Sequence, residues 1–358
     1  MRKTPLYEAH LELNARIVDF AGWAMPVFYT GILEEARSVR TKVGIFDISH
    51  MGRITVQGSG ATRFLQLFTS NDVEALKPSE AQYSLLTNPD GGIIDDIIVY
   101  RESSDSYRVV INAGNSAKDL KWLRSNLPEE VSLTDQTDET AMIAIQGPDA
   151  PGLLAKLAEN PELLNLKRFQ YATGKLLGAE TTFCRTGYTG EDGFEIIVPA
   201  ERAIEIWKEL VKLGATPCGL GSRDALRIEA GYPLYGHEID DTTSPVEAGL
   251  MWVVKLEKES FMGSEAIKAC KTKGPIRRLV GLLSSERIQP KQGYVILSGD
   301  DEIGVITSGV FSPTLNTSVA MGYVFTEFAK TGAQVEIAIR DKRVKATLVQ
   351  KKNLLEKK

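Results

Sequence analysis

The sequence predicts a protein of two or three domains that mixes helices and strands and ends in a small antiparallel β-barrel. Its 358 residues are too many for one ordinary hydrophobic core. Helical and strand patterns are mixed over the first part of the chain, up to a boundary near Cys270–Pro275. Beyond that boundary, short strands recur between glycine-containing turns, which is the usual pattern of a small barrel.

The composition narrows the class of protein. Hydrophobic residues make up 43% of the chain and charged residues 25%, as in soluble globular proteins. The net charge of −5 argues against a nucleic-acid-binding protein. No run approaches the ~18 apolar residues that a membrane helix needs. The first residues resemble neither a secretory signal nor a transit peptide, so we expect a cytoplasmic protein without a membrane partner.

Cysteines and histidines are too dispersed to predict a disulfide framework or a metal site. The cysteines form no C-x-x-C pair and fit buried thiols in a reducing compartment: Cys184, Cys218 and Cys270. The histidines do not pair at metal-binding spacing, so we expect no metal: His10, His50 and His237. His50 is expected to be structural or hydrogen-bonding.

The elements follow from local pattern. Apolar residues at helical spacing predict helices, and clustered β-branched and aromatic residues predict strands. The expected helices cover residues 31–40, 60–68, 116–125, 149–159, 202–212 and 225–230, with Ser116 and Ser222 as N-caps. The expected strands of the first part lie within 43–56, at 81–86, 93–100, 107–112 and 141–148, and directly after the glycine-rich loop 187–193. The barrel strands are expected at 278–283, 294–297, 302–308, 319–324, 334–339 and 345–349.

The strands Ile93–Tyr100 and Tyr107–Asn112 form a predicted antiparallel hairpin around a polar loop. Successive side chains of a strand point to opposite faces, so Asp95 and Asp96 must separate, one solvated and the other on the apolar face. If the loop closes symmetrically, Asp96 lies opposite Asn112. A buried acid is costly without a partner, so this pair indicates a possible site. The alternative is that both aspartates are solvated at a frayed strand end.

Two further charged positions allow more than one interpretation. Glu195 follows the glycine-rich loop 187–193 and, taken alone, fits a solvated strand end. Arg223 and Arg227 are four residues apart and share a helix face, which suits an anionic ligand or a surface salt bridge. The segment 219–224 reads G-x-G-x-x-D; without a third glycine it is a weak dinucleotide-binding motif.

Several long motifs carry the interpretation further, and they occur in one order along the chain. They are F-D-I-S-H-M-G-R (46–53), G-G-I-I-D-D-I-I-V-Y (91–100), V-I-N-A-G-N (110–115), G-Y-T-G-E-D-G (187–193), G-S-R-D-A-L-R-I-E-A-G (221–231) and T-S-G-V-F-S-P-T (307–314). Together they closely resemble the T-protein family of the glycine cleavage system, the aminomethyltransferases. The resemblance implies an α+β, three-domain cloverleaf around a central folate site. Residues 1–270 would form two intertwined α+β domains, and residues 275–358 the C-terminal antiparallel β-barrel.

The resemblance also implies a reaction and its partners. The methylene of an aminomethyl group on the lipoyl sulfur of H-protein would pass to tetrahydrofolate, giving 5,10-methylenetetrahydrofolate, ammonia and dihydrolipoyl H-protein. Tetrahydrofolate would be a co-substrate, and no metal is implied. Lipoylated H-protein would be the direct partner, with functional association to the P-protein and L-protein, and neither nucleic acid nor a membrane would take part.

Site residues transfer from the family motif by motif. Asp96 matches the acid used in catalysis, where a fixed carboxylate can orient the folate amine, stabilise a cation and relay a proton. Asn112 matches a pterin-site residue, Glu195 an acid facing the pterin edge, and Arg223 a ligand-contacting arginine. Arg227 either helps with the glutamate tail or braces Glu229. Aromatic and thioether side chains that fit pocket walls or stacking partners are Met51, Tyr83, Tyr100 and Tyr188.

One departure and four rivals complete the comparison with the family. The charged tail Lys351–Lys358 replaces the Pro-Phe aromatic segment of many relatives and is expected to fray. Folate proteins that support iron–sulfur enzymes carry K-G-C-Y-x-G-Q-E, whereas residues 258–265 here read K-E-S-F-M-G-S-E, without cysteine. A folate-dependent demethylase would share the pterin site and differ in its donor channel. A non-catalytic folate-binding protein would be expected to lose Asp96, and a flavin-fused dehydrogenase would need a further N-terminal nucleotide-binding domain.

Overall fold

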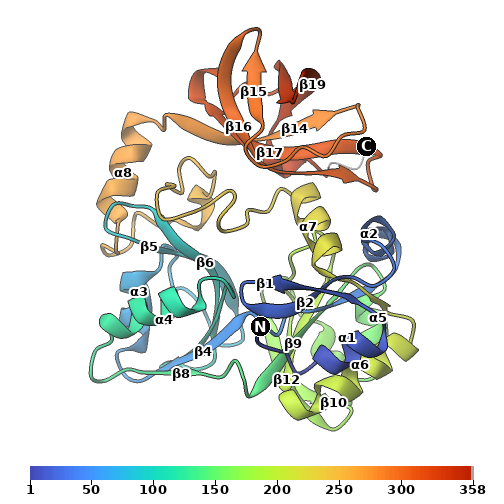
Figure 1. Cartoon of the computed structure of the whole chain (residues 1–358). Helices are drawn as coiled ribbons and strands as arrows, with labels where there is room; N and C mark the ends of the chain where they lie inside the picture. The colour runs from blue at the N-terminus through green and yellow to red at the C-terminus, as the bar shows by residue number, and fades with distance from the viewer. Residues whose placement is uncertain (356–358) are drawn as a thin grey trace. The chain divides into compact units, whose positions relative to one another are not determined.

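The computed structural model describes residues 1–355, which form two compact units. The first unit contains residues 1–84 and 96–223, and the second contains residues 85–95 and the chain from residue 224 onward. The helices are α1 (Tyr7–Glu12), α2 (Ile32–Thr41), α3 (Ala61–Phe68), α4 (Ser116–Ser125), α5 (Ala150–Leu154), α6 (Ala203–Lys212), α7 (Leu220–Glu229) and α8 (Ser264–Lys273) (Figure 1). Short 3₁₀ turns are η1 (Pro161–Leu164), η2 (Ala200–Arg202), η3 (Met251–Val253), η4 (Thr326–Phe328) and η5 (Lys351–Asn353).

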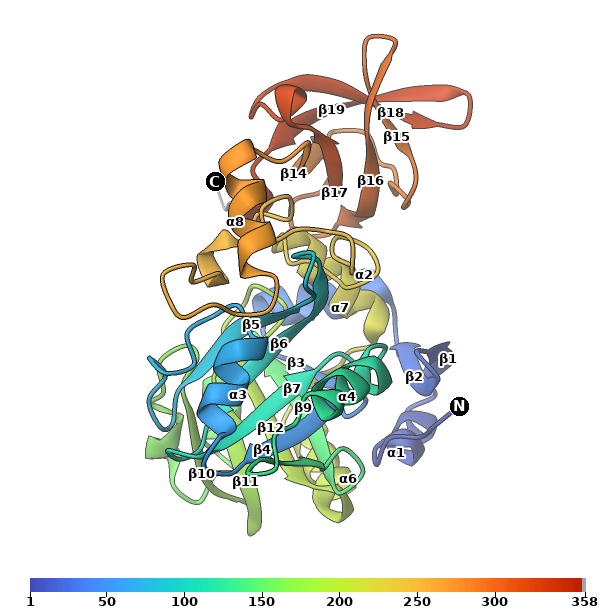
Figure 2. The ribbon, with the colours of Figure 1, turned by 90° about the vertical axis from the view of Figure 1, so that its left-hand side faces the viewer.

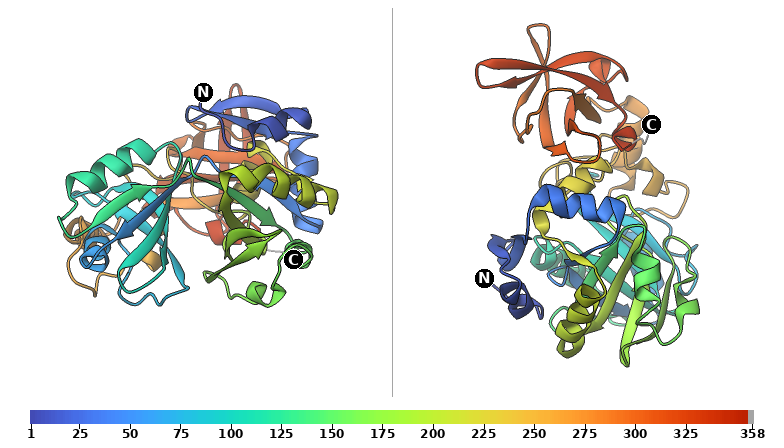
Figure 3. Two further views of the ribbon diagram at one scale, coloured as in Figure 1. Left: turned by 90° about the horizontal axis from the view of Figure 1, so that it is seen from below. Right: turned by 90° about the vertical axis from the view of Figure 1, so that its right-hand side faces the viewer.

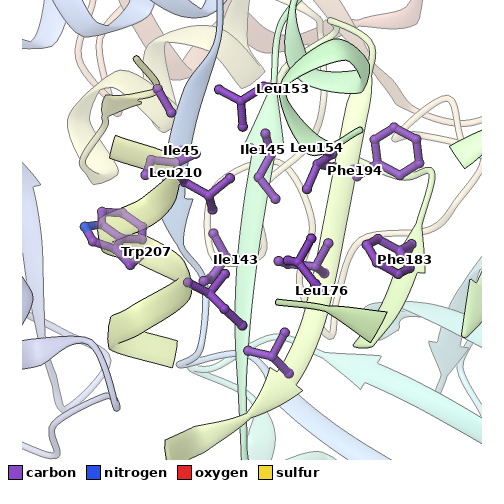
Figure 4. Close-up of a cluster of buried hydrophobic side chains, with 14 of the residues drawn as sticks. Ile45, Ile143, Ile145, Leu153, Leu154, Leu176, Phe183, Phe194, Trp207 and Leu210 are labelled. Atoms are coloured by element: carbon purple, nitrogen blue, oxygen red, sulfur yellow. The ribbon is translucent and has the colours of Figure 1, made fainter. Parts of the chain in front are cut away.

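A six-stranded sheet carries the main core of the first unit. Its strand order is β10-β11-β12-β9-β3-β13, and its pairs are antiparallel except for β13 with β3. Figure 4 shows Trp207 and Leu210 of α6 close to Ile143 and Ile145 of β9, all within one buried cluster. The strands are β3 (Gly44–Asp47), β9 (Thr140–Gln146), β10 (Tyr171–Leu176), β11 (Ala179–Cys184), β12 (Gly193–Pro199) and β13 (Thr216–Pro217).

A second sheet has the order β5-β6-β7-β4-β8. Helices α3 and α4 lie on the same face of this sheet (Figure 2 and the left view of Figure 3). The first unit also holds a separate two-stranded hairpin of β1 with β2. The bounds of these strands are β1 (Arg16–Phe20), β2 (Trp23–Phe28), β4 (Gly52–Gln57), β5 (Ala81–Thr87), β6 (Ile93–Arg101), β7 (Ser106–Ile111) and β8 (Ser132–Asp135).

The second unit contains the predicted antiparallel barrel, drawn in orange to red in Figure 3. It closes in the order β14-β17-β16-β15-β18-β19, so the prediction is confirmed. Leu354 is buried and would be touched by any side chain added at Gly281, so the expected fraying of the tail is wrong up to residue 355; residues 356–358 lie outside the described part. The strands are β14 (Arg277–Ser284), β15 (Val295–Ser298), β16 (Asp301–Ser312), β17 (Thr317–Phe325), β18 (Gln334–Ile339) and β19 (Lys342–Val349).

All the predicted helices are present, although the ends of some differ from the prediction. Helix α5 stops at Leu154 instead of reaching 159, and the backbone N–H of Glu159 instead donates to the carbonyl of Lys175 on β10 (3.0 Å). The N-cap of α4 is Asn115 rather than Ser116. Ser222 lies inside α7, which begins earlier than predicted. All three cysteines are free thiols, and Cys184 and Cys218 are buried.

A buried polar network anchors the N-terminus to β3. Asp47 accepts hydrogen bonds from the Thr4 hydroxyl (2.6 Å), His10 Nε2 (2.9 Å) and the Ser49 N–H (2.9 Å). The other ring nitrogen of His10 is 2.9 Å from the Tyr29 hydroxyl. Burial alone would raise the pKa of Asp47, but the His10 contact and the hydroxyl donors lower it to about 2.

An Asp47→Asn variant should therefore lose much of the acid dependence of folding. Because the folded-state pKa of Asp47 is below its ordinary value of 3.8, ionised Asp47 stabilises the fold above about pH 4, and this contribution disappears as the pH falls towards 2. We expect the wild type to lose on the order of 2 kcal/mol from this group over that interval. Urea unfolding at several pH values measures it; parallel curves for wild type and variant would contradict the assignment.

Candidate functional site

The β6–β7 hairpin brings Asp96 and Asn112 together in the predicted register. Ile98 pairs with Val110 and Tyr100 with Arg108, and extending this register by two residues places Asp96 opposite Asn112. The side-chain amide of Asn112 donates to Asp96 Oδ1 (2.8 Å) and to the Asp96 backbone carbonyl (3.1 Å). The assumed symmetric closure of the loop is therefore confirmed.

Tyr83 of β5 holds the other oxygen of the same carboxylate. Its hydroxyl donates to Asp96 Oδ2 at 2.9 Å. Asp96 is half-buried, and each of its two oxygens has a fixed donor. The carboxylate is thus held in one orientation while part of it stays accessible. Hydrogen bonds donated to both oxygens favour the ionised form of a carboxylate.

Asp95 differs from both sequence-based interpretations. It is fully buried, so the expectation that one of the two aspartates is solvated is wrong, as is the alternative that both are. The reason lies in the strand: Asp95 shares its face of β6 with Ile97 and Val99, and these are buried as well. The face that carries Asp95 is fully covered, whereas Asp96 and Ile98 on the other face are partly exposed, and alternation alone cannot reveal this difference.

Glu195 of β12 is the second acidic member of the site in the first unit. It is only 7% exposed, so the solvated strand end expected from its position is wrong. Thr186 donates its hydroxyl to Glu195 Oε2 (2.6 Å), and the Tyr100 hydroxyl lies 3.4 Å from the same Thr186 oxygen. Burial raises the pKa of Glu195, opposed by the charge of Arg223 and the Thr186 hydrogen bond.

Arg223 and Tyr188 form a cation–π pair beside this acid. The guanidinium carbon lies 4.8 Å from the centre of the Tyr188 ring. Burial lowers the pKa of Arg223, while Glu195 and Tyr188 oppose the shift. Within the described residues, Arg223 Nη1 is buried without a hydrogen-bond partner. A buried carboxylate, a guanidinium with an unused donor and an aromatic ring fit a flat heterocycle with donors and acceptors on its edge.

The other two predicted site residues, Met51 and Arg227, have partners outside the group formed by Glu195, Arg223 and Tyr188. Met51 lies half-buried in the turn before β4, where its carbonyl accepts from Arg53 Nη1. Arg227 belongs to the second unit and is buried in an ion pair with Glu238 (2.6 Å). The two arginines that the sequence places on one helix face therefore have separate partners. No group of three or more His, Cys, Asp or Glu side chains within residues 1–355 is arranged to hold a metal.

Two residues near the site were not recognised as such from the sequence. Thr186 links Tyr100 to Glu195, and its place immediately before the glycine-rich loop was the only available signal. His50 was expected to be a structural or hydrogen-bonding residue. It is buried against Phe20, its Nδ1 has no partner in the described part of the chain, and burial lowers its pKa to about 4.

Comparison with known proteins identifies the family. Residues 6–258 match the model of the GCVT N-terminal domain, and residues 277–353 match that of the glycine cleavage T-protein C-terminal barrel domain. The chain belongs to the glycine cleavage T-protein family. The second match covers the six barrel strands of this T-protein family member, and the first contains every predicted site residue.

Similar proteins extend over almost the whole length of this T-protein family member. An aminomethyltransferase of Chloroherpeton thalassium is 47% identical, with 98% of each chain covered. One of Halothermothrix orenii is 44% identical, covering 98% of this chain and 99% of the relative. The crystal structure of glycine cleavage system aminomethyltransferase T from Bartonella henselae superposes with a TM-score of 0.90 at 36% identity, covering 97% and 96% of the two chains. The α+β fold with a C-terminal barrel is therefore that of the family, and no helix in the described residues could span a membrane.

Proposed function

We propose that the polar cluster of the first unit binds tetrahydrofolate and that Asp96 supplies the catalytic carboxylate. The chain is an aminomethyltransferase of the glycine cleavage system, since its family and its relatives of similar length carry that activity. Folate is the co-substrate of this class. The observation that carries the proposal is the Asp96 carboxylate, whose two oxygens are held by Tyr83 and Asn112.

The proposed reaction begins with an aminomethyl group on the lipoyl sulfur of H-protein. The carbon–sulfur and carbon–nitrogen bonds of the aminomethyl group break, and the methylene carbon becomes bonded to the two folate nitrogens. The two protons lost from those nitrogens go to the lipoyl sulfur and the departing amine, so that dihydrolipoyl H-protein and ammonia leave. Asp96 orients the attacking amine, stabilises positive charge on the transferred carbon and nitrogen, and accepts a proton. Tyr83 and Asn112 keep the carboxylate aimed, which removes the cost of ordering it during the reaction.

The remaining residues of the cluster suit the pterin. Glu195 would accept hydrogen bonds from the N–H edge of the aminopyrimidine ring. Arg223 would direct its unused Nη1 donor at a ring acceptor, and Tyr188 would offer a stacking face. Tyr100 is joined to the cluster by the contact of its hydroxyl with that of Thr186. Met51 would provide an apolar wall.

Membership in the glycine cleavage system implies protein partners from that system. We assign the donor role to lipoylated H-protein, and the association with P-protein and L-protein would act through the same carrier. The cytoplasmic location expected from the sequence stays a prediction.

The direct test is turnover of the donor. Purified protein is mixed with aminomethyl-lipoyl H-protein and tetrahydrofolate, and ammonia and 5,10-methylenetetrahydrofolate are measured. Stoichiometric formation of both products supports the assignment. If the protein binds tetrahydrofolate but leaves this donor unchanged, the rival reading as a folate-dependent demethylase or a non-catalytic folate-binding protein takes its place.

A Tyr83→Phe variant should change the pH profile of the reaction more than its maximum rate. Without the phenol, one Asp96 oxygen loses a donor that favours the ionised carboxylate, so the acidic limb of the kcat profile should move to higher pH. We expect kcat at neutral pH to fall about three- to tenfold. Tyr107→Phe is the matched control, because that buried phenol lies in the same sheet and contacts Thr62 (2.7 Å) rather than Asp96. Identical profiles in all three proteins would refute the role of Tyr83.

A further inference from the structure

Helix α2 contributes none of the proposed folate-binding residues, yet it carries two buried charges. Glu35 is fully buried and Arg40 is 8% exposed. Burying a charge costs several kcal/mol unless specific partners compensate it. The partners of these two side chains lie next to Tyr188 and next to Arg223, which form the cation–π pair of the site.

Arg40 holds the loop that carries Tyr188. Its Nη1 donates to the carbonyl of Thr189 (2.6 Å), the residue directly after Tyr188, and to Glu191 Oε1 (3.2 Å). The side chains of this ion pair are 4% and 13% exposed, so water screens the pair weakly. The backbone on the C-terminal side of Tyr188 is therefore fixed to α2.

Gln146 of β9 holds the same loop from the other side. It donates to the carbonyl of Thr186 (3.1 Å) and accepts from the Thr189 hydroxyl (2.8 Å). A side chain at Gly187 would place its Cβ 2.0 Å from Gln146 Oε1, so the approach requires glycine. Hydrogen bonds therefore hold the loop on both sides of Tyr188.

Glu35 holds the first turn of α7, which carries Arg223. Its Oε2 accepts from the backbone N–H of Gly219 (2.9 Å) and from the Ser222 hydroxyl (3.1 Å). Its Oε1 accepts from the N–H groups of Tyr29 (2.6 Å) and Thr30 (3.1 Å) at the start of α2. One helix therefore anchors the backbone under both members of the cation–π pair.

We propose that Arg40 and Glu35 are positioning residues that set the geometry of the Tyr188–Arg223 pair and, through it, the affinity for the pterin. The inference rests on the proposed folate site and adds residues outside it. An aromatic ring and a hydrogen-bond donor that are fixed before binding hold the pterin more tightly than mobile ones, because these side chains lose less conformational entropy on binding. Asp96 and Tyr83 belong to another sheet and Asn112 directly follows its strand β7, so the chemical step should not depend on α2.

An Arg40→Met variant tests this separation of affinity from rate. Methionine fills similar space and cannot donate to Thr189 or Glu191. We expect tetrahydrofolate affinity, measured by calorimetry on the full chain, to fall about tenfold, with kcat at saturating folate within about twofold of wild type. Arg40→Lys keeps one donor and should recover part of the affinity. Arg185→Met is the matched control, because Arg185 pairs with Asp192 of the same loop (3.0 Å) at its more exposed end, and it should leave the affinity unchanged.

A double-mutant cycle with Tyr188→Ala distinguishes positioning from a general loss of folding. If Arg40 acts through Tyr188, Arg40→Met should change the affinity less than twofold once the ring is absent. Additive losses, an unchanged affinity in Arg40→Met, or an equal loss in Arg185→Met would each overturn the inference. Failure of the wild type to bind tetrahydrofolate would instead refute the proposed function, so the two failures are distinguishable.

Discussion

An Asp96→Asn variant is expected to bind tetrahydrofolate within about threefold of wild type and to lose about a thousandfold in kcat. The amide keeps the size of the side chain and an oxygen that can accept one of the two hydrogen bonds. It can neither accept the proton nor carry the charge that stabilises a cationic intermediate. The measurement is single-turnover formation of 5,10-methylenetetrahydrofolate from aminomethyl-lipoyl H-protein, with folate binding followed separately.

Two further variants sharpen this prediction. Asp96→Glu keeps the charge but moves it by one methylene, which breaks its alignment with Tyr83 and Asn112, so most of the activity should again be lost. Asp90→Asn changes an exposed acid in the turn between β5 and β6 and should leave kcat unchanged. An active Asp96→Asn protein would exclude Asp96 as the catalytic carboxylate even if the protein remains an aminomethyltransferase.

The parts of this site that follow from the sequence are those fixed by local geometry. The β6–β7 register follows from loop symmetry, so Asp96 and Asn112 could be paired in advance. The barrel follows from short strands separated by glycine turns. Both depend on neighbours within a few tens of residues, where chain connectivity limits the alternatives.

Long-range contacts account for what the sequence did not predict. Glu195 is buried beside Thr186 and the charge of Arg223, and strand pattern alone cannot give those neighbours. Ser222 is a good N-cap residue by local rules, but its hydroxyl donates to Glu35, 187 positions away. The sequence suggested Tyr83 only as an aromatic pocket wall. The hydrogen bond from its hydroxyl to Asp96 depends on the tertiary fold, which the sequence pattern does not give. Single residues thus change role when a distant element supplies their partner.

An Arg227→Met variant is expected to lose about 3–5 kcal/mol of unfolding free energy. Arg227 and Glu238 are 1% and 0% exposed, and removal of the guanidinium leaves a buried, unpaired carboxylate. Arg227 also donates to Ser308 of the barrel strand β16 (2.7 Å), so the loss should fall on the second unit. Urea unfolding measures the effect. Arg343→Met provides the control, because its pair with Asp300 is exposed and should contribute nothing measurable.

The same variant decides between the glutamate-tail role and the bracing role expected for Arg227. The sequence suggested Glu229 as the braced residue, whereas the structure pairs Arg227 with Glu238. If Arg227 braces the fold, the Arg227→Met variant should lose unfolding free energy. A second substitution, Glu238→Leu, should recover much of this loss because it removes the buried, unpaired carboxylate. If Arg227 binds the glutamate tail, the Arg227→Met variant should instead lose more affinity for polyglutamylated than for monoglutamylated folate, with little change in its unfolding free energy. The Glu238 carboxylate also accepts from the N–H of Leu234 (3.0 Å) and the Thr307 hydroxyl (2.5 Å). Because this network joins the segment after α7 to the barrel strand β16, we expect the stability result.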